Sequence, residues 1–152
     1  MKPDLVIGLG NPLMGDDGIG RLVAERLAND PRLPESVEVI PGGPDLLRYA
    51  QHIEGRSRVF VIDAIQDDVA PGTISVFADG TGELESRQEH AHHLSAVQAI
   101  ELLRLTTRAS FVLVSISIPS AAVVPAASAA VASRMPAILA RVIEELGHGR
   151  PL

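Results

Sequence analysis

The residues of this chain that could do chemistry are aspartates in two segments and a group of histidines. Asp16 and Asp17 follow a loop with several glycines, Asp63 ends the apolar run VFVIDA, and His90, His92 and His93 stand together farther along. Carboxylates and an imidazole would make an open site for a divalent ion such as nickel or zinc, with positions left for water or for ligands of a partner. Because the chain has no cysteine, thiolate catalysis and zinc-thiolate sites are excluded.

Each of these features also has a simpler structural interpretation. Asp16 or Asp17 could cap the helix expected from residue 16, and Asp63 could be a turn or cap residue. The histidines could belong to a solvated polar loop. Taken singly, these roles are favoured, but the combination of carboxylates from separate strand ends with an imidazole favours a metal site.

Short apolar runs and segments with helical spacing alternate along the chain, and these elements must position the polar residues. Strands are expected at 4–10, 36–40, 58–64, 73–77 and 111–118, and helices from residue 16 and at 44–53, 93–105 and 126–146. This order predicts a largely parallel sheet with right-handed crossovers. The turn at Pro71 and Gly72 permits hairpin-like or edge pairing of the strand after it, which leaves a mixed sheet open. The first loop and Asp63 should be neighbours, because both follow strands at the carboxyl edge of the sheet.

Several common functions do not fit the sequence. Leu13 stands where a dinucleotide fingerprint needs its third glycine, and no Gly-Lys-Ser/Thr follows a glycine loop, so no nucleotide cofactor is expected. The net charge of -6, without a clustered basic surface, argues against nucleic acid. Ser115 and Ser117 could hydrogen-bond locally, but neither has the spacing of a serine nucleophile.

The length of 152 residues predicts one domain over residues 1–152. The amino terminus lacks the longer apolar region of a signal peptide, and the Ala/Val-rich stretch 121–132, interrupted by Pro125, would be a poor membrane span. A cytoplasmic location without membrane contact is therefore expected.

Five segments together resemble the hydrogenase maturation endopeptidase family in identity and order. They are VIGLGNPLMGDDGIG at 6–20, the paired glycines at 42–43, VFVIDA at 59–64, PGT at 71–73 and HAHHLS at 90–95. The similarity spans essentially the whole chain. It implies a three-layer αβα sandwich around a twisted, mostly parallel sheet, of the phosphorylase/hydrolase-like type, which agrees with the α/β pattern of elements.

The resemblance also implies site residues. Asp17, Asp63 and His92 match the positions that bind the nickel of the precursor, and they are the predicted catalytic and metal-binding residues. His92 stands three residues before Ser95, which is the usual spacing of the family, and His93 is the alternative. The nickel is expected to come with the precursor and not to be a resident cofactor.

The implied reaction is cleavage of one peptide bond near the C-terminus of a nickel-loaded nickel–iron hydrogenase large subunit, by an aspartyl-type endopeptidase. A monomer is expected, because a protein that must dock a large precursor can form its functional interface with that substrate. Two departures from the family put its detailed specificity in question: Pro41 replaces a frequent acidic residue, and Ser115 replaces a common glycine. Two alternatives stay open. One is a metal-dependent peptidase or amidase with resident zinc and another substrate, and the other is a nickel-sensing chaperone that binds the precursor without cutting it.

Overall fold

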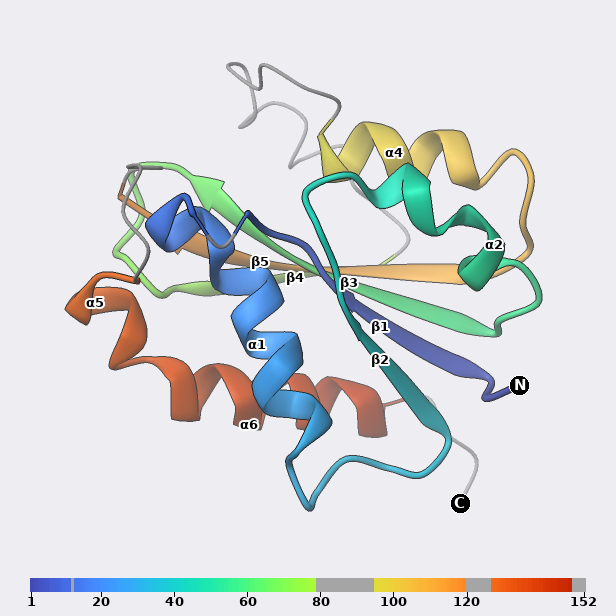
Figure 1. Ribbon diagram of the computed structural model, residues 1–152, viewed down its shortest axis with the longest axis horizontal. Coiled ribbons are helices and arrows are strands. Elements are labelled where there is room, and N and C mark those ends of the chain that lie inside the picture. The colour runs from blue at the N-terminus through green and yellow to red at the C-terminus, as the bar shows by residue number, and fades with distance from the viewer. Residues whose placement is uncertain (12, 79–94, 120–126, 149–152) are drawn as a thin grey trace.

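Five strands form one mixed sheet at the centre of the molecule (Figure 1). The computed structural model describes residues 1–11, 13–78, 95–119 and 127–148. The strands are β1 (Asp4–Gly8), β2 (Val37–Pro41), β3 (Arg58–Gln66), β4 (Ile74–Ala78) and β5 (Ser110–Ile118), in the spatial order β2-β1-β3-β5-β4. Four strands run parallel, and the edge strand β4 pairs antiparallel with β5. The mostly parallel α/β sheet predicted from the sequence is confirmed.

Helical segments cover both faces of this sheet. They are η1 (Gly15–Gly18), α1 (Ile19–Ala28), η2 (Leu46–Tyr49), α2 (Ala50–Ile53), α4 (Ala96–Leu103), α5 (Ala129–Ala132) and α6 (Met135–Gly147). Helices α1 and α6 lie on one face and α2 and α4 on the other (Figure 1). This arrangement is the expected αβα sandwich.

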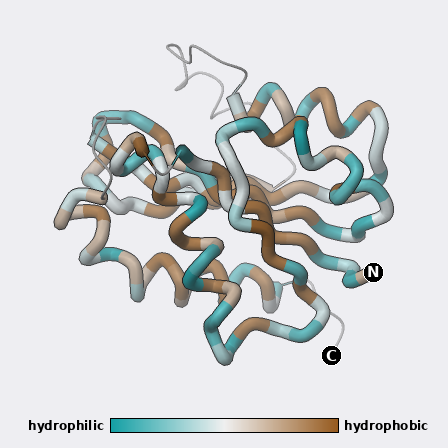
Figure 2. Tube along the Cα trace, in the orientation of Figure 1, coloured by the Kyte–Doolittle hydropathy of each residue, from teal (hydrophilic) through white to brown (hydrophobic). Residues whose placement is uncertain are grey.

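The strands are apolar on both faces because each face is covered by helices. Along β3, Val59 and Val61 belong to the core under α2 and α4, whereas Phe60 and Ile62 belong to the core under α1 and α6. Figure 2 shows the resulting concentration of hydrophobic residues along the central strands. Since side chains alternate along a strand, Asp63 emerges on the α2 and α4 face.

The first helix differs from its prediction. A 3₁₀ turn occupies Gly15–Gly18, and α1 begins only at Ile19. The N-cap positions of these two segments are Met14 and Gly18, and neither makes a side-chain capping hydrogen bond. The capping role considered for Asp16 or Asp17 is therefore wrong, and the side chains at this turn are used for other contacts.

Four other elements are shorter or divided. The helix expected at 44–53 is divided into the 3₁₀ turn η2 and the short helix α2. The long helix expected at 126–146 is split into α5 and α6, and Pro136, which has no N–H to donate, lies in the first turn of α6. The helix expected from residue 93 begins at Ala96, where Ser95 and Gln98 form a capping box. The first strand ends at Gly8 and not at Gly10. The hairpin-like alternative for β4 is also wrong, because its partner is β5.

Candidate active site

The carboxyl edge of the sheet brings Asp17 and Asp63 close together. Asp17 lies in η1, directly after the loop that follows β1, and Asp63 lies near the end of β3. Both side chains are half-buried, and η1 contacts β3. The predicted proximity of the two segments is confirmed. The catalytic and metal-binding roles of these residues remain predictions.

Gly20 makes this approach of the turn to β3 sterically feasible. A Cβ atom at Gly20 would lie 2.3 Å from the carbonyl oxygen of Leu9 and 2.4 Å from that of Ile62. A Cβ atom at Gly8 would lie 2.1 Å from the carbonyl oxygen of Gly20. Any larger residue at these positions would push α1 away from β1 and β3. These glycines therefore hold the turn that carries Asp17 against the residue that precedes Asp63.

Asp16 has a structural role that differs from that of its neighbour. Its side chain is 6% exposed, and its Oδ1 atom accepts a hydrogen bond of 2.6 Å from the backbone N–H of Ser128. Ser128 is the N-cap residue of α5, where its own hydroxyl accepts from the N–H of Val131. Asp16 thus ties the 3₁₀ turn to a segment more than 100 residues later in the chain.

The electrostatic environment of Asp63 disfavours its ionised form. Burial, and after it the negative charge of Asp17, raise the pKa of Asp63 from 3.8 to about 8, although the Ala64 N–H lowers it. That N–H donates to Asp63 Oδ1 over 2.9 Å. The pair therefore contains a carboxyl group that keeps its proton near neutral pH, which is an arrangement common at functional sites.

Polar side chains extend from Asp63 across the neighbouring strands. Asp63 is in register with Ser115 on β5, and Ser115 is in register with Ser75 on β4. Ser115 is 2% exposed, and within the described parts of the chain its hydroxyl has no hydrogen-bond partner. Ser117, two residues later on the same face, donates from its hydroxyl to Asp67 Oδ2 over 3.3 Å. The local hydrogen bonding predicted for these two serines is therefore wrong: the partner of Ser117 is 50 residues away in the sequence, and Ser115 has none among the described residues.

The paired glycines Gly42 and Gly43, which follow β2, are hydrogen-bonded to the end of β1 and to the loop after it. The N–H of Gly42 donates to the carbonyl oxygen of Gly8 over 2.7 Å, and the N–H of Gly10 donates to that of Gly43 over 3.3 Å. The hydroxyl of Tyr49 accepts a hydrogen bond of 2.8 Å from the N–H of Gly43. The loop after β2 is therefore fixed to the loop that leads to Asp17.

The third predicted ligand, His92, lies outside the described residues, as do the alternative His93 and the neighbouring His90. Within residues 1–11, 13–78, 95–119 and 127–148, no group of three His, Cys, Asp or Glu side chains is arranged to hold a metal ion. Two carboxylate-bearing residues of the predicted set are therefore placed together, and the histidine stays a prediction. Their oxygen donors suit a divalent ion that takes its remaining ligands elsewhere.

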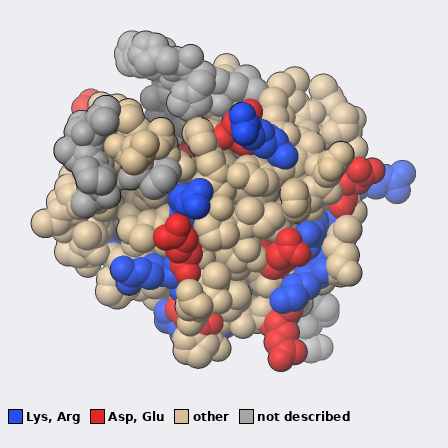
Figure 3. Space-filling model, in the orientation of Figure 1, with Lys and Arg blue, Asp and Glu red and all other residues tan. Residues whose placement is uncertain are grey.

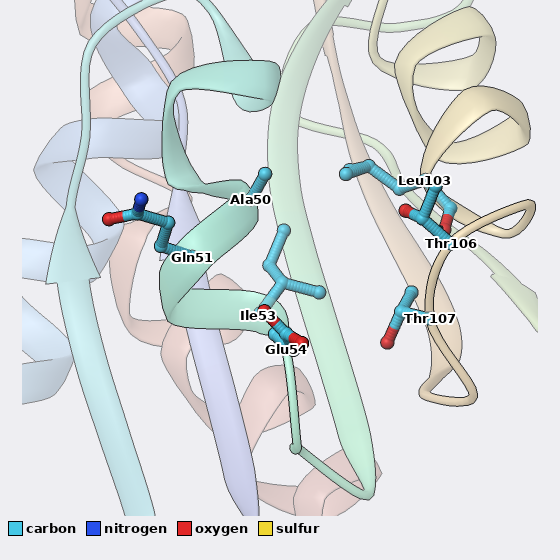
Figure 4. A pocket seen from close by; sticks show the side chains of 7 residues that line it. All are labelled: Ala50, Gln51, Ile53, Glu54, Leu103, Thr106 and Thr107. Carbon is cyan, nitrogen blue, oxygen red and sulfur yellow. The ribbon is translucent and has the colours of Figure 1, made fainter.

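A shallow pocket lies well away from these carboxylates. It is lined by the α2 residues Ala50, Gln51 and Ile53, by Glu54, and by Leu103, Thr106 and Thr107 at the end of α4 (Figure 4). These segments lead into β3 and β5, so the pocket is near the amino ends of the strands. Glu54 is its one ionisable lining residue. The pocket carries no arrangement comparable to the aspartate pair.

The tertiary contacts that support this edge were not predicted from the sequence. The spacing of glycines at 8, 10, 18 and 20 was a usable signal, because it is typical of a helix packed closely against a strand. The contact of Asp16 with Ser128 had no comparable signal, since more than 100 residues separate them. The role of Tyr49 also depends on a loop conformation that its residue type does not specify.

The fold and this edge define a class: an αβα protein that presents paired carboxylates beyond the carboxyl ends of a mostly parallel sheet. The family model described as hydrogenase maturation protease matches residues 22–145. The chain therefore belongs to the hydrogenase maturation protease family.

Individual relatives agree with this assignment. The chain is 31% identical over 104 residues to the hydrogenase 2 maturation protease of Escherichia coli, which covers 67% of this chain and 63% of that protein. It is 35% identical over 75 residues to the hydrogenase expression/formation protein HupM of Azotobacter chroococcum, covering 49% of this chain but only 36% of that relative. These matches thus span less than two thirds of the relatives' own lengths.

Solved structures are similar over a larger part of the chain. The nickel–iron hydrogenase maturation protease HybD from Thermococcus kodakarensis has a TM-score of 0.74 at 28% identity, covering 94% of this chain and 97% of that one. The hydrogenase maturating endopeptidase HybD from Escherichia coli has a TM-score of 0.78 at 25% identity, covering 95% and 93%. The similarity of fold therefore extends over nearly the full length of both chains.

Proposed function

We propose that this protein is an endopeptidase that removes the C-terminal extension of a nickel-loaded nickel–iron hydrogenase large subunit. Family membership supports the class of reaction and the class of substrate. The observation that carries the proposal is the pair formed by Asp17 and Asp63 at the carboxyl edge of the sheet. Burial, and after it repulsion by Asp17, raise the pKa of Asp63, and a cation delivered by the substrate would offset both effects by stabilising the ionised pair.

The chemistry of the donors fits nickel that is already held by the precursor. Two carboxylates supply oxygen ligands, and His92, the proposed third ligand, would supply nitrogen, which together suit a divalent transition metal. A site with few protein ligands leaves coordination positions for groups of the precursor. Because a metal competes with the proton for Asp63, recognition of the loaded precursor would include loss of that proton.

Docking through the nickel would bring the scissile peptide bond to the same edge. Holding the bond next to a carboxylate makes the reaction effectively intramolecular. Once the metal has displaced its proton, the ionised carboxylate of Asp63 can accept a hydrogen bond or a proton from the attacking water. In this proposal Asp17, Asp63 and His92 hold the metal-loaded substrate, and Asp63 also orients or deprotonates the attacking water.

The remaining features of the proposal concern the setting of the reaction. No helix within the described ranges is long and apolar enough to cross a membrane. Acidic and basic side chains are mixed on the face in Figure 3, and the net charge is -6, which gives no support to nucleic-acid binding. We therefore propose a cytoplasmic monomer whose functional interface forms with the precursor.

The test is to incubate the purified protein with its precursor large subunit, prepared with and without nickel, and to follow the mass of the subunit. Loss of a C-terminal peptide from the nickel-loaded subunit alone is the expected result. Cleavage of both forms equally would contradict recognition through nickel.

Two further outcomes would point to the alternative functions. A stable complex with a verified, loaded precursor that stays uncut would indicate a nickel-sensing chaperone. Zinc retained at one equivalent through purification, together with hydrolysis of unrelated peptides, would indicate a peptidase with a resident metal.

A further inference from the structure

Asp63 on β3, Ser115 on β5 and Ser75 on β4 form a polar row across the sheet. The hydroxyl of Ser115 in this row has no assigned role. Ser115 is on β5, which lies between β3 and β4 in the sheet. Its side chain is buried, and its Oγ atom has no hydrogen-bond partner among the residues that the structure describes. Leaving a buried hydroxyl unpaired is unfavourable, and native proteins rarely do so without a functional reason. The position therefore calls for a nearby acceptor that the hydroxyl can reach by a change of rotamer.

The register of the sheet identifies Asp63 as that acceptor. Asp63 and Ser115 occupy paired positions on adjacent parallel strands, and both side chains emerge on the α2 and α4 face. Neighbouring strands are only about 4.8 Å apart, so a change of the Ser115 rotamer can carry its hydroxyl to the carboxylate. Asp63 Oδ1 already accepts from the Ala64 N–H, which leaves Oδ2 to receive a second donor.

Other neighbours of Ser115 on this face are weaker candidates. Ser117 is two residues along the same strand, but its hydroxyl already donates to Asp67. Leu113, two residues in the other direction, is apolar and belongs to the core. Ser75 is the paired residue on β4, and it offers a neutral hydroxyl where Asp63 offers a carboxylate, which is the stronger acceptor.

We propose that Ser115 is a positioning residue, whose hydroxyl donates to Asp63 Oδ2 and fixes the orientation of that carboxylate during peptide cleavage. The inference rests on the proposed endopeptidase function. With Oδ1 held by Ala64 and Oδ2 by Ser115, the plane of the carboxylate is set from two sides. An oriented carboxylate keeps its reacting oxygen at the required position, so that the effect appears in kcat and not in binding of the precursor.

The test compares Ser115→Ala with Ser117→Ala in cleavage of the nickel-loaded precursor. Both changes delete one hydroxyl from the same face of β5, at side chains that are 2% and 1% exposed. Ser115→Ala is expected to lower kcat by roughly 10- to 100-fold, the factor for losing one hydrogen bond to a charged group, with KM unchanged. Ser117→Ala is expected to keep kcat within about twofold of the wild-type value, since its hydroxyl bonds to Asp67.

Stability should change in the opposite order. Ser115→Ala removes an unpaired hydroxyl, so its Tm should equal or exceed that of the wild type, whereas Ser117→Ala loses a hydrogen bond and should melt lower. A merely structural role for Ser115 predicts a lower Tm and an unchanged kcat. The two variants therefore separate positioning from general support of the fold.

A second pair of variants controls for shape. Threonine and valine are both β-branched and similar in shape, so Ser115→Thr and Ser115→Val share most of any steric cost, and the difference between them reports the hydroxyl. The threonine variant should cleave at least tenfold faster than the valine variant. Ser75→Ala should leave kcat unchanged, and a loss as large as that of Ser115→Ala would assign the partner to Ser75 and overturn the proposal.

The outcomes distinguish this inference from the function on which it rests. If the wild-type protein cleaves and a folded Ser115→Ala variant cleaves equally fast, Ser115 has no positioning role, and the endopeptidase function stands. If the threonine and valine variants are equal, the hydroxyl is likewise excluded. Absence of cleavage by the wild-type protein would overturn the proposed function, and the assignment of Ser115 with it.

Discussion

The carboxylates at the two ends of the central sheet have opposite electrostatic environments. At the amino end, Arg58 pairs with Asp4 over 2.6 Å and also donates to the carbonyl oxygens of Leu146 and His148. At the carboxyl end, Asp63 has a backbone N–H as its donor and a second negative charge, that of Asp17, as its neighbour. The amino end therefore neutralises its buried carboxylate with an arginine, and the carboxyl end places two carboxylates close enough for one to raise the pKa of the other.

A second arginine, Arg56, also stabilises the amino end of the sheet. Its side chain is buried, and it donates to the carbonyl oxygens of Lys2 and His52 and to Glu38 Oε2. A buried cation with this many acceptors joins segments that are distant in sequence. At the carboxyl edge the corresponding link is made by backbone, through Gly8, Gly20 and the paired glycines after β2. Close backbone packing thus holds the segments that carry the aspartates in place.

The largest effect is expected from substitution of the aspartates at the carboxyl end of the sheet. Asp17→Asn and Asp63→Asn should each lower cleavage of the nickel-loaded precursor by at least about 10³-fold, because each removes a charge proposed to act on the substrate. Asp16→Asn is the matched control, since an amide oxygen can still accept from the Ser128 N–H. It should cleave within about threefold of the wild type, measured as the mass shift of the subunit.

A contrary ordering would be informative. If Asp16→Asn lost activity while Asp17→Asn kept it, the assignment of the ligand within the acidic pair would be reversed. If all three variants cleaved normally, the carboxyl edge would not be the active site.

The amino end should respond in stability and not in activity. Arg58→Met leaves the carboxylate of Asp4 buried without this guanidinium and should lower the free energy of unfolding by about 3 kcal/mol, as measured by urea denaturation. Arg48→Ala, which removes a long, exposed ion pair with Asp45, should change it by less than about 0.5 kcal/mol. The folded fraction of Arg58→Met should retain the wild-type kcat. A large loss of kcat there would show that the two ends are coupled.

The raised pKa of Asp63 should also make the stability of the protein depend on pH. Native Asp63 keeps its proton up to a pH of about 8, whereas an unfolded chain releases it near the ordinary pKa of 3.8. The native state therefore binds more protons between these values, so that the free energy of unfolding contributed by this group is complete below pH 4 and declines as the pH rises to 8.

Asp63→Asn should remove this decline in the metal-free protein. We expect it to be more stable than the wild type by roughly 2 kcal/mol at pH 8 and equal to it at pH 4, below the full linkage value because the side chain is only half-buried. Urea denaturation at both pH values measures the difference. A gain that is the same at pH 4 and pH 8 would rule out the proton of Asp63 as its source.

The sequence was sufficient to predict the central strands and the position of Asp63 because both depend on local patterns. The run from Val59 to Ile62 is apolar at every position, which is typical of a parallel strand covered on both faces, and an aspartate at its end must emerge at the carboxyl edge. The pairing of β4 with β5 could not be predicted in the same way. More than 30 residues separate these strands, and the short connection from β3 permitted either a hairpin with β3 or an edge position, of which the edge position is observed.

The supporting contacts were unpredictable for a related reason. Asp16 and Asp17 are adjacent and chemically identical, yet one is buried against Ser128 and the other faces Asp63. Only the 3₁₀ turn, whose side chains point in different directions from those of an α-helix, separates their roles. Ser115 likewise differs from Ser117 only through what lies beside it on the neighbouring strand.

The smallest effect expected is the electrostatic coupling within the carboxylate pair. Asp17→Asn removes the second-largest cause of the raised pKa of Asp63, so that pKa should fall, as measured from the pH dependence of the ¹³C carboxyl resonance. It should remain above 3.8, because burial is the larger cause and is unchanged by the substitution. Asp67→Asn, at the carboxylate that accepts from Ser117, serves as the control and should change the pKa of Asp63 less. An unchanged pKa in Asp17→Asn would mean that Asp17 is too far from Asp63 for one cation to bind both, and the contrast between the two ends would then rest on burial alone.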